Sequence, residues 1–346
     1  MPARLADIAE EANVSVATVS RVLRDVPDAR VSDATRERIS RIAEALHYHP
    51  NPYGQALSYG RAALVSVVLR RTKYQIPTLK VFALLSELDK LGRDVGIAAR
   101  VLGETPLEPV MKKLLVGAPE AVVLLQPPWS DEDIRTLCEA LSEDGSNVLL
   151  VDPDDPSALP GDLPCDTVWV DRIHGFRLAT SHLFECGHRH VALIAARQHA
   201  TRFEGYEQAV ADQGMHAPIV GFLDEATPVG PAARRAAQQL LQHDPRITAL
   251  VCGSDLVAAA AMSAVRDMGL QVGRDVAVVG FDNEPWTAYL SVPLTTVAQP
   301  VAQLCQTAFG LLSDRLNGGG GPWQRVAVKP RLVIRETSGA NIDVGG

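Results

Sequence analysis

The sequence predicts a small N-terminal all-α helix-turn-helix domain followed by a larger α/β domain of two parallel-sheet lobes. Residues 5–23 form two short stretches of helical period around a tight turn. From Leu64 onward, short apolar runs alternate with amphipathic stretches, the pattern of parallel strands covered by helices on both faces. These repeats are too many for one small sheet, so we expect two similar lobes. Ligands of such folds bind at the carboxyl ends of the strands.

The two N-terminal helices each have one apolar face. Asn13 falls in the turn between them, where Asn tolerates a left-handed backbone better than other residues with a Cβ. Ser15 is placed to cap the second helix, and Ser32 to cap a third. The apolar positions are Leu5, Ile8 and Ala12 in the first helix, Val19, Val22 and Leu23 in the second, and Ile39, Ile42, Ala43 and Leu46 in the third.

The opposite face of the second helix combines small apolar groups, a hydroxyl and two guanidinium groups. Such a set suits base edges and phosphates, so the pattern predicts a sequence-specific DNA-binding protein. The alternative is an ordinary helical hairpin in a core. The residues of this face are Val16, Ala17, Ser20, Arg21 and Arg24.

Composition narrows the class of protein. The chain has 346 residues, 47% of them hydrophobic, and a net charge of −8, which argues against a protein that coats nucleic acid non-specifically. Its five cysteines are dispersed and never spaced as Cys-x-x-Cys, which fits reduced thiols in a cytoplasmic protein. There is no apolar leader and no run of membrane-spanning length, so we expect neither export nor membrane anchoring.

The alternation of helical and strand patterns predicts three segments: a helix-turn-helix domain over 1–49, a linker over 50–61 that could start a short helix, and a bilobed domain over 62–346. In the linker, Asn51 can cap a short helix. The expected strands lie at 64–69, 121–125, 148–151, 191–194, 249–251 and 276–279, and the expected helices at 78–91, 131–143, 174–186, 230–242 and 255–268.

An ordered set of motifs resembles the LacI/GalR family of bacterial transcription regulators over nearly the whole chain. The motifs are Val14-Ser15-Val16-Ala17-Thr18-Val19-Ser20-Arg21-Val22-Leu23, Val31-Ser32, Thr35-Arg36-Glu37-Arg38, Tyr48-x-Pro50-Asn51 leading to Leu57, Gly187-His188-Arg189, Arg202-x-x-Gly205-Tyr206, Val278-Val279-Gly280-Phe281-Asp282-Asn283, Pro293-Leu294-Thr295-Thr296-Val297 and Pro330-Arg331-Leu332-Val333-Ile334-Arg335. The resemblance implies a periplasmic-binding-protein-like bilobed domain behind the DNA-binding helices.

The resemblance also implies how this chain meets double-stranded operator DNA. Val16, Ala17 and Arg21 would face bases in the major groove. Leu57 matches the hinge leucine that enters the minor groove, next to Asn51 of the same hinge. A homodimer would present two such units to a pseudo-palindromic operator. The residues expected to position the domain on phosphates are Ser15, Thr18, Ser20 and Arg24.

For the larger domain, the resemblance implies effector contacts at Arg202, Asp282 and Ser254, and Trp286 could stack on a ligand. The simplest role of Ser254 is to cap a helix, and for Trp286 it is core packing. We expect a sugar or sugar derivative as effector, with a purine or another small polar metabolite as the alternative. Whether the effector releases the operator or strengthens its binding stays open.

Other function classes receive less support from the sequence. A solute-binding module of the periplasmic type would share the bilobed architecture but would not need residues 1–60. An enzyme would need a catalytic signature, and we find no nucleophile elbow, phosphate-binding loop, dinucleotide fingerprint or His-Glu-x-x-His site. We therefore expect no enzymatic activity, no cofactor and no metal.

Overall fold

The computed structural model describes residues 5–23, 31–46, 48, 62–70, 75–90, 96–102, 106–153, 155–214, 218–224 and 226–339. The chain divides into two compact units, residues 1–63 and 64–346. Three residues of the predicted DNA-binding set, Arg24, Asn51 and Leu57, lie outside the described residues.

The first unit contains the predicted three helices, α1 (Leu5–Glu11), α2 (Val16–Leu23) and α3 (Asp33–Ala45). Asn13 has the expected left-handed backbone, with φ of 50°. The Ser15 hydroxyl accepts a hydrogen bond from the Thr18 N–H at 3.1 Å, and Ser32 caps α3 in the same way through Thr35. The three helices share one core of Ile8, Ala9, Ala12, Val19, Val22, Ile39 and Ala43.

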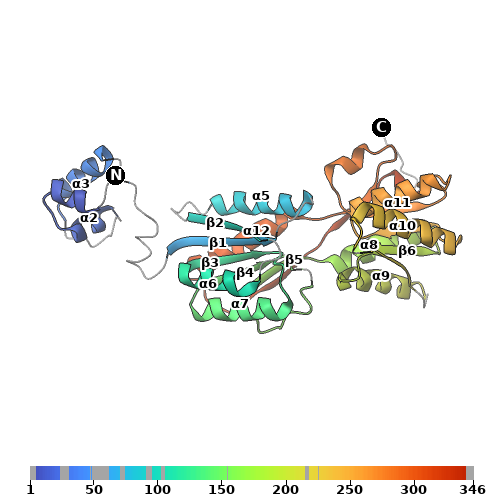
Figure 1. Cartoon of the computed structure of the whole chain (residues 1–346), viewed down its shortest axis with the longest axis horizontal. Helices are drawn as coiled ribbons and strands as arrows, with labels where there is room; N and C mark the ends of the chain where they lie inside the picture. Colours follow the sequence, from blue (N-terminus) through green and yellow to red (C-terminus); the bar gives the residue numbers. More distant parts are fainter. Residues whose placement is uncertain are drawn as a thin grey trace. The chain divides into compact units, whose positions relative to one another are not determined.

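The first lobe of the second unit is a six-stranded sheet in the order β11-β5-β4-β3-β1-β2. The pairs β1–β2, β3–β4, β4–β5 and β5–β11 run parallel. Helices α5 (Gln75–Asp89) and α12 (Val301–Leu316) pack on one face, and α6 (Leu107–Gly117) and α7 (Asp131–Glu143) on the other (Figure 1). The strands are β1 (Ala62–Arg70), β2 (Gly96–Leu102), β3 (Pro119–Leu125), β4 (Asn147–Val151), β5 (Asp166–Val170) and β11 (Arg325–Val328).

The second lobe is a six-stranded sheet in the order β12-β10-β9-β8-β6-β7, parallel except for β12, which runs antiparallel to β10. Helices α10 (Val229–His243) and α11 (Asp255–Asp267) cover one face, and α8 (Arg172–Glu185) and α9 (Ala200–Asp212) the other. The remaining elements are β6 (Val191–Ala195), β7 (Ile219–Phe222), β8 (Ala249–Cys252), β9 (Ala277–Asp282), β10 (Thr295–Ala298), β12 (Arg331–Val333) and the 3-10 helices η1 (Pro285–Tyr289) and η2 (Glu336–Ser338). The predicted fold class, two lobes with parallel sheets, is therefore confirmed, with one antiparallel edge strand added.

The chain passes between the lobes three times: from β5 to α8, from β10 to α12, and from β11 to β12. Each lobe is therefore assembled from segments that are distant in sequence. These connections bring residues 171, 299–300 and 329–330 to the place where the two lobes meet. Among the described residues no helix combines the length and the apolar character that crossing a bilayer requires.

Candidate functional site

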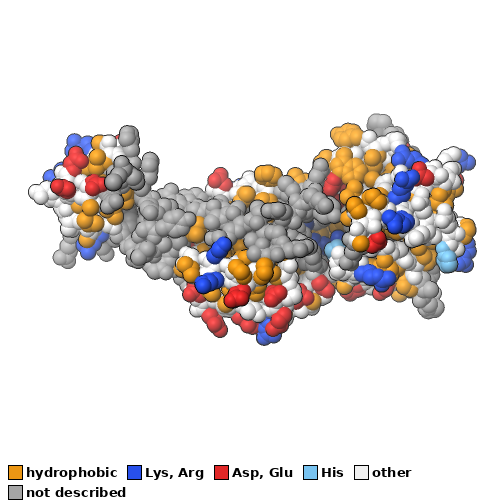
Figure 2. Space-filling model, in the orientation of Figure 1, with side chains coloured by type: hydrophobic (Ala, Val, Ile, Leu, Met, Phe, Trp, Pro, Cys, Tyr) orange, Lys and Arg blue, Asp and Glu red, His pale blue; other side chains and the backbone are white. Residues whose placement is uncertain are grey.

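The first candidate site is the exposed side of α2. Val19 and Val22 are buried in the three-helix core, whereas Val16, Ala17 and Arg21 are exposed. This division follows from the 3.6-residue period of the helix, because positions 19 and 22 lie on one face and 17 and 21 on another. On the face shown in Figure 2, basic and acidic side chains are mixed over the described part of this unit. Any recognition of a nucleic acid by this face of α2 would therefore rest on a few placed side chains, and that role stays a prediction.

The other predicted residues of this helix have local roles. The Ser15 hydroxyl caps α2 and lies 2.8 Å from the Thr18 hydroxyl, and Thr18 and Ser20 are half-buried. A phosphate contact is compatible with these positions because a hydroxyl both donates and accepts. Contacts to phosphates by Ser15, Thr18 and Ser20 stay predictions.

The second candidate site lies where the two lobes meet. Gln126 follows β3, Asp152 follows β4, and Asp282 ends β9, so all three lie at carboxyl ends of parallel strands. Each has a positive φ, of 46°, 54° and 125° respectively, which costs a residue with a Cβ about 1–3 kcal/mol. Such outliers concentrate at binding sites, and here they turn polar side chains away from the sheets.

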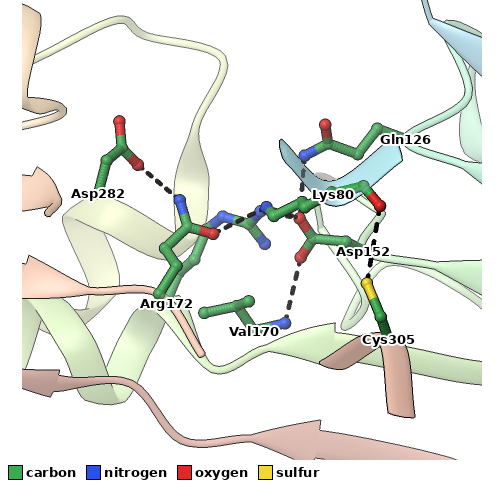
Figure 3. A network of polar contacts seen from close by, with 8 residues as sticks. Lys80, Gln126, Asp152, Val170, Arg172, Asp282 and Cys305 are labelled. Atoms are coloured by element: carbon green, nitrogen blue, oxygen red, sulfur yellow. Dashed lines mark hydrogen bonds and ion pairs between the residues drawn. The ribbon is translucent and has the colours of Figure 1, made fainter. Parts of the chain in front are cut away.

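Asp152 is the centre of a polar network that we call the junction network: Lys80, Gln126, Asp152, Arg172, Asp282 and Gln299. Figure 3 labels the first five of these residues. The Oδ2 atom of Asp152 accepts from Lys80 Nζ at 2.5 Å, from Arg172 Nη2 at 2.7 Å and from Gln126 Nε2 at 2.9 Å. Its Oδ1 accepts from the Val170 N–H at 3.1 Å. Asp152 therefore binds the connection between β5 and α8, where Val170 and Arg172 stand.

Lys80 connects this network to the second lobe. It occupies the core-facing stripe of α5 with Leu84 and Leu88, and its exposed fraction is only 1%. Besides Asp152, its ammonium donates to Gln299 Oε1 at 2.8 Å, and Gln299 Nε2 in turn donates to Asp282 Oδ1 at 2.5 Å. A continuous chain of bonds thus joins α5 of the first lobe to β9 of the second.

The charges of the network follow from burial and pairing. Burial acts to raise the pKa of Asp152, but the Arg172 guanidinium and the Lys80 ammonium outweigh it and hold this pKa far below its usual range. Burial lowers the pKa of Lys80, and Asp152 opposes that shift. Burial raises the pKa of Asp282 to about 6, against the Gln299 hydrogen bond and the charges of Lys80 and Arg202. Near neutral pH the network therefore combines buried cations with two carboxylates.

Of the four predicted effector residues, Arg202 and Asp282 lie close enough to interact electrostatically. The Ser254 hydroxyl accepts from the Val257 N–H at 3.3 Å and caps α11, which is the simpler of its two predicted roles. The half-buried Trp286 donates its indole N–H to Glu284. Effector contacts by all four residues stay predictions.

The sequence reading did not single out Lys80, Gln126, Asp152, Arg172 or Gln299. For two of them a signal existed, because Gln126 and Asp152 follow directly on expected strands, at the edge where ligands of such folds bind. For Lys80 the signal is its spacing of four and eight residues from Leu84 and Leu88, which places a lysine on the buried stripe of an amphipathic helix.

Asp255, the first residue of α11, is a buried carboxyl group like Asp152, and it lies near Asp282 in the second lobe. Its Oδ1 lies 2.5 Å from the Thr296 hydroxyl and its Oδ2 accepts from the Glu284 N–H at 2.7 Å. Burial and the nearby Asp282 raise the pKa of Asp255 to about 8. The Thr296 hydroxyl donates to Oδ1 and itself accepts from the Asn283 N–H at 3.3 Å, so the Asp255 carboxyl is the acceptor in both of its contacts.

We expect Asp255→Asn to remove a pH dependence of stability. The folded state holds the Asp255 proton up to pH 8 while the unfolded state loses it near its ordinary pKa of 3.8, so rising pH destabilises the fold across this interval. Asp282, with a pKa of about 6, titrates in both proteins, so between pH 6 and 8 the wild type should lose about 2 kcal/mol more than the variant. Urea unfolding at both pH values measures this difference, and equal pH dependence of the two proteins would contradict it.

Comparison with known proteins agrees with this architecture. Residues 4–51 match the family model described as "Bacterial regulatory proteins, lacI family", and residues 180–338 match a periplasmic binding protein-like domain. The regulator CelR of Thermobifida fusca is 30% identical, over 95% of this chain and 96% of CelR.

Solved structures give the same result. The Lac repressor dimer bound to operator and the anti-inducer ONPF superposes with a TM-score of 0.81 at 26% identity, over 98% of this chain and 100% of that one. The CelR–cellobiose complex superposes with a TM-score of 0.68 at 28% identity, over 97% and 99% of the two chains. These relatives are DNA-binding transcription regulators and not enzymes, so the predicted class of protein is confirmed. This chain belongs to the LacI family of bacterial regulatory proteins.

Proposed function

We propose that this regulator is a repressor that binds a pseudo-palindromic operator as a homodimer and that a small polar effector, a sugar or sugar derivative, controls its affinity for DNA. The observation that carries the proposal is α2, whose apolar side is buried while Val16, Ala17 and Arg21 stay exposed. The operator-bound Lac repressor dimer and the cellobiose complex of CelR, both similar to this chain, support it.

We propose that three consecutive segments of the chain have different roles. Residues 1–49 read DNA, residues 50–61 form the hinge with Leu57 as the minor-groove wedge, and residues 62–346 bind effector and dimerise. Effector at Arg202 and Asp282 favours one arrangement of the lobes and so changes operator affinity by the difference in its binding free energy to the two arrangements. We place this regulator in the cytoplasm, and its five free thiols support that proposal.

Selection of bound sequences from random duplex DNA by the full-length protein tests this function. We expect a pseudo-palindromic motif. For Arg21→Ala we expect loss of base preference at one position in each half-site, costing about 1–3 kcal/mol of discrimination, because the guanidinium can bind a guanine through two hydrogen bonds. Arg38→Ala, at an exposed position of α3, is the control and should leave the selected motif unchanged. Enrichment of no motif by the wild type, with or without metabolite extract, would contradict operator binding.

The dimer is proposed to use the outer face of α5. Leu79 and Phe82 point away from the core there, and Phe82 is 66% exposed. Two large apolar side chains exposed on one helix face indicate a contact with another protein. We propose a second copy of this chain as that protein, because a symmetric dimer matches the two halves of a pseudo-palindromic operator. We expect Phe82→Glu to shift the protein from dimer to monomer in sedimentation equilibrium at micromolar concentration. Thr136→Glu adds the same charge to an exposed position of α7 and should leave a dimer. A dimeric F82E protein would exclude this face.

A further inference from the structure

The Gln299 side chain bridges the two lobes with a single amide group. Its oxygen accepts from the Lys80 ammonium at 2.8 Å, and its nitrogen donates to the Asp282 carboxylate at 2.5 Å. An amide fits between a cation and an anion because it has an acceptor at one end and a donor at the other. Gln299 is only half-buried and stands in the connection from β10 to α12. Gln126 and Asp282 are also half-buried, but Gln299 is the neutral side chain that bridges the two lobes, so a ligand that enters between Lys80 and Asp282 would displace its amide.

The first-lobe side of this bridge offers hydrogen-bond donors. Asp152 already accepts from four groups, which fills the roughly four acceptor positions of a carboxylate. It thus has no capacity left for a ligand. Of the three buried charged residues there, Lys80 and Arg172 are positive and only Asp152 is negative, so their sum is one positive charge. A ligand reaching this side meets cationic donors.

The second-lobe side offers a carboxylate. Asp282 accepts from Gln299 through one oxygen and lies near Arg202. A carboxylate accepts hydrogen bonds from hydroxyl groups, and an adjacent guanidinium donates to their oxygens. The two sides together require a ligand with strong acceptors at one end and hydroxyl groups at the other.

We infer that the effector is an anionic polyol, whose carboxylate or phosphate group binds Lys80 while its hydroxyl groups bind Asp282 in place of the Gln299 amide. The inference rests on the proposed control by a small molecule and specifies its chemistry. An anionic oxygen displaces the amide oxygen because a hydrogen bond between two charged groups is about twice as strong as one to a neutral carbonyl. Sugar acids and sugar phosphates share this chemistry.

Isothermal titration calorimetry of the full-length protein with matched compounds tests the inference. The compounds are D-glucose, D-gluconate and D-glucose 6-phosphate, then D-galactose and D-galacturonate, and inorganic phosphate. We expect at least one sugar acid or sugar phosphate to bind about tenfold or more tightly than its neutral counterpart. Comparing the affinities of the sugar acids with that of the sugar phosphate shows whether a carboxylate or a phosphate group is preferred. Equal or tighter binding of the neutral sugars, or no binding of any anionic compound up to about 10 mM, would overturn the inference.

Variants locate the charge that matters. Lys80→Met should weaken binding of the anionic compound by roughly 10- to 100-fold, because it removes a charge-assisted hydrogen bond. Lys90→Met removes the same charge from the exposed end of α5, where Lys90 pairs with Glu87, and should leave affinity unchanged. Equal losses in both variants would mean a long-range charge effect and would overturn the assignment to Lys80.

A second variant guards against misfolding of Lys80→Met. Gln299→Glu keeps the size of the side chain and holds a carboxylate beside Lys80, so it should compete with the ligand and lower anion affinity at least tenfold. Circular dichroism checks that it is folded. Wild-type anion affinity in a folded Q299E protein would overturn the inference.

Operator affinity measured with the same compounds separates this inference from the proposed function. If an anionic compound binds at Lys80 but operator affinity does not change, the ligand class stands and the proposed control fails. If a neutral sugar alone changes operator affinity, the proposed control stands and the anionic ligand class fails.

Discussion

We expect Asp152→Asn to lower the free energy of unfolding of the effector domain by about 3–5 kcal/mol. Asparagine keeps the size of the side chain but removes the negative charge, which leaves the Lys80 ammonium and the Arg172 guanidinium buried without their shared counter-ion. Its amide also presents N–H groups where Asp152 accepts from four donors. Breaking a buried ion pair from one side is costly because the remaining charges stay desolvated.

Tryptophan fluorescence during urea unfolding measures this loss. All four tryptophans, Trp129, Trp169, Trp286 and Trp323, lie in the second unit, so the signal reports on the effector domain alone. Asp212→Asn is the matched control, because Asp212 pairs with Arg177 at 2.9 Å but both side chains are about half exposed. Exposed pairs contribute at most about 1 kcal/mol. Equal losses for the two variants would refute a special role of the buried pair.

Gly205→Ala should have the second largest effect, on both stability and effector binding. A Cβ at position 205 would lie 2.2 Å from the carbonyl oxygen of Ile173 and 3.0 Å from the Cβ of Phe176. The backbones of α8 and α9 therefore approach each other too closely for any side chain at this position, and α9 must move away. We expect a loss of about 1–3 kcal/mol, as for other overpacked sites.

The displacement of α9 also reaches the site, because Arg202 lies three residues before Gly205 on the same helix. Effector affinity should therefore fall together with stability. Gly230→Ala is the control: it lies in α10 with nothing within 4 Å of its added Cβ, and alanine there should be neutral or stabilise by about 0.4–1 kcal/mol. Calorimetric titration with effector and urea unfolding check both variants. A G205A protein with wild-type stability would contradict the close helix contact.

Much of this fold could be predicted from local patterns in the sequence. The turn at Asn13 and the caps at Ser15 and Ser32 depend on neighbouring residues only, and each has the expected conformation. Helix α7 has the predicted bounds, 131–143. The strands that were predicted, β1, β3, β4, β6, β8 and β9, are continuous apolar runs because both faces are buried. Strands β2, β5, β7, β10, β11 and β12 were not predicted. Although β5 and β10 lie inside their sheets, they begin with the polar pairs Asp166-Thr167 and Thr295-Thr296, and β7, β11 and β12 are short and partly exposed.

The site could be predicted only in part. Asp282 and Arg202 follow from the resemblance to a family, whereas the Lys80–Asp152–Arg172 cluster joins residues 72 and 20 positions apart in the chain. Gln299 is still more distant, at 219 positions from Lys80. No local pattern encodes such a contact. A lysine in an amphipathic helix ordinarily keeps its ammonium group in water. The ammonium group of Lys80 is buried instead, because α5 packs beside α12 against the first-lobe sheet, and the sequence does not show this packing.

The threefold passage of the chain between the lobes has a consequence for synthesis. The first lobe receives its covering helix α12 and its edge strand β11 from residues 301–328, and the second lobe receives β12 from residues 331–333. On the ribosome, the helices of the first unit emerge and can fold long before either lobe is complete. A chain terminated before residue 301 therefore retains the three helices of the first unit but contains no finished lobe, so premature termination yields the first unit without a folded second one.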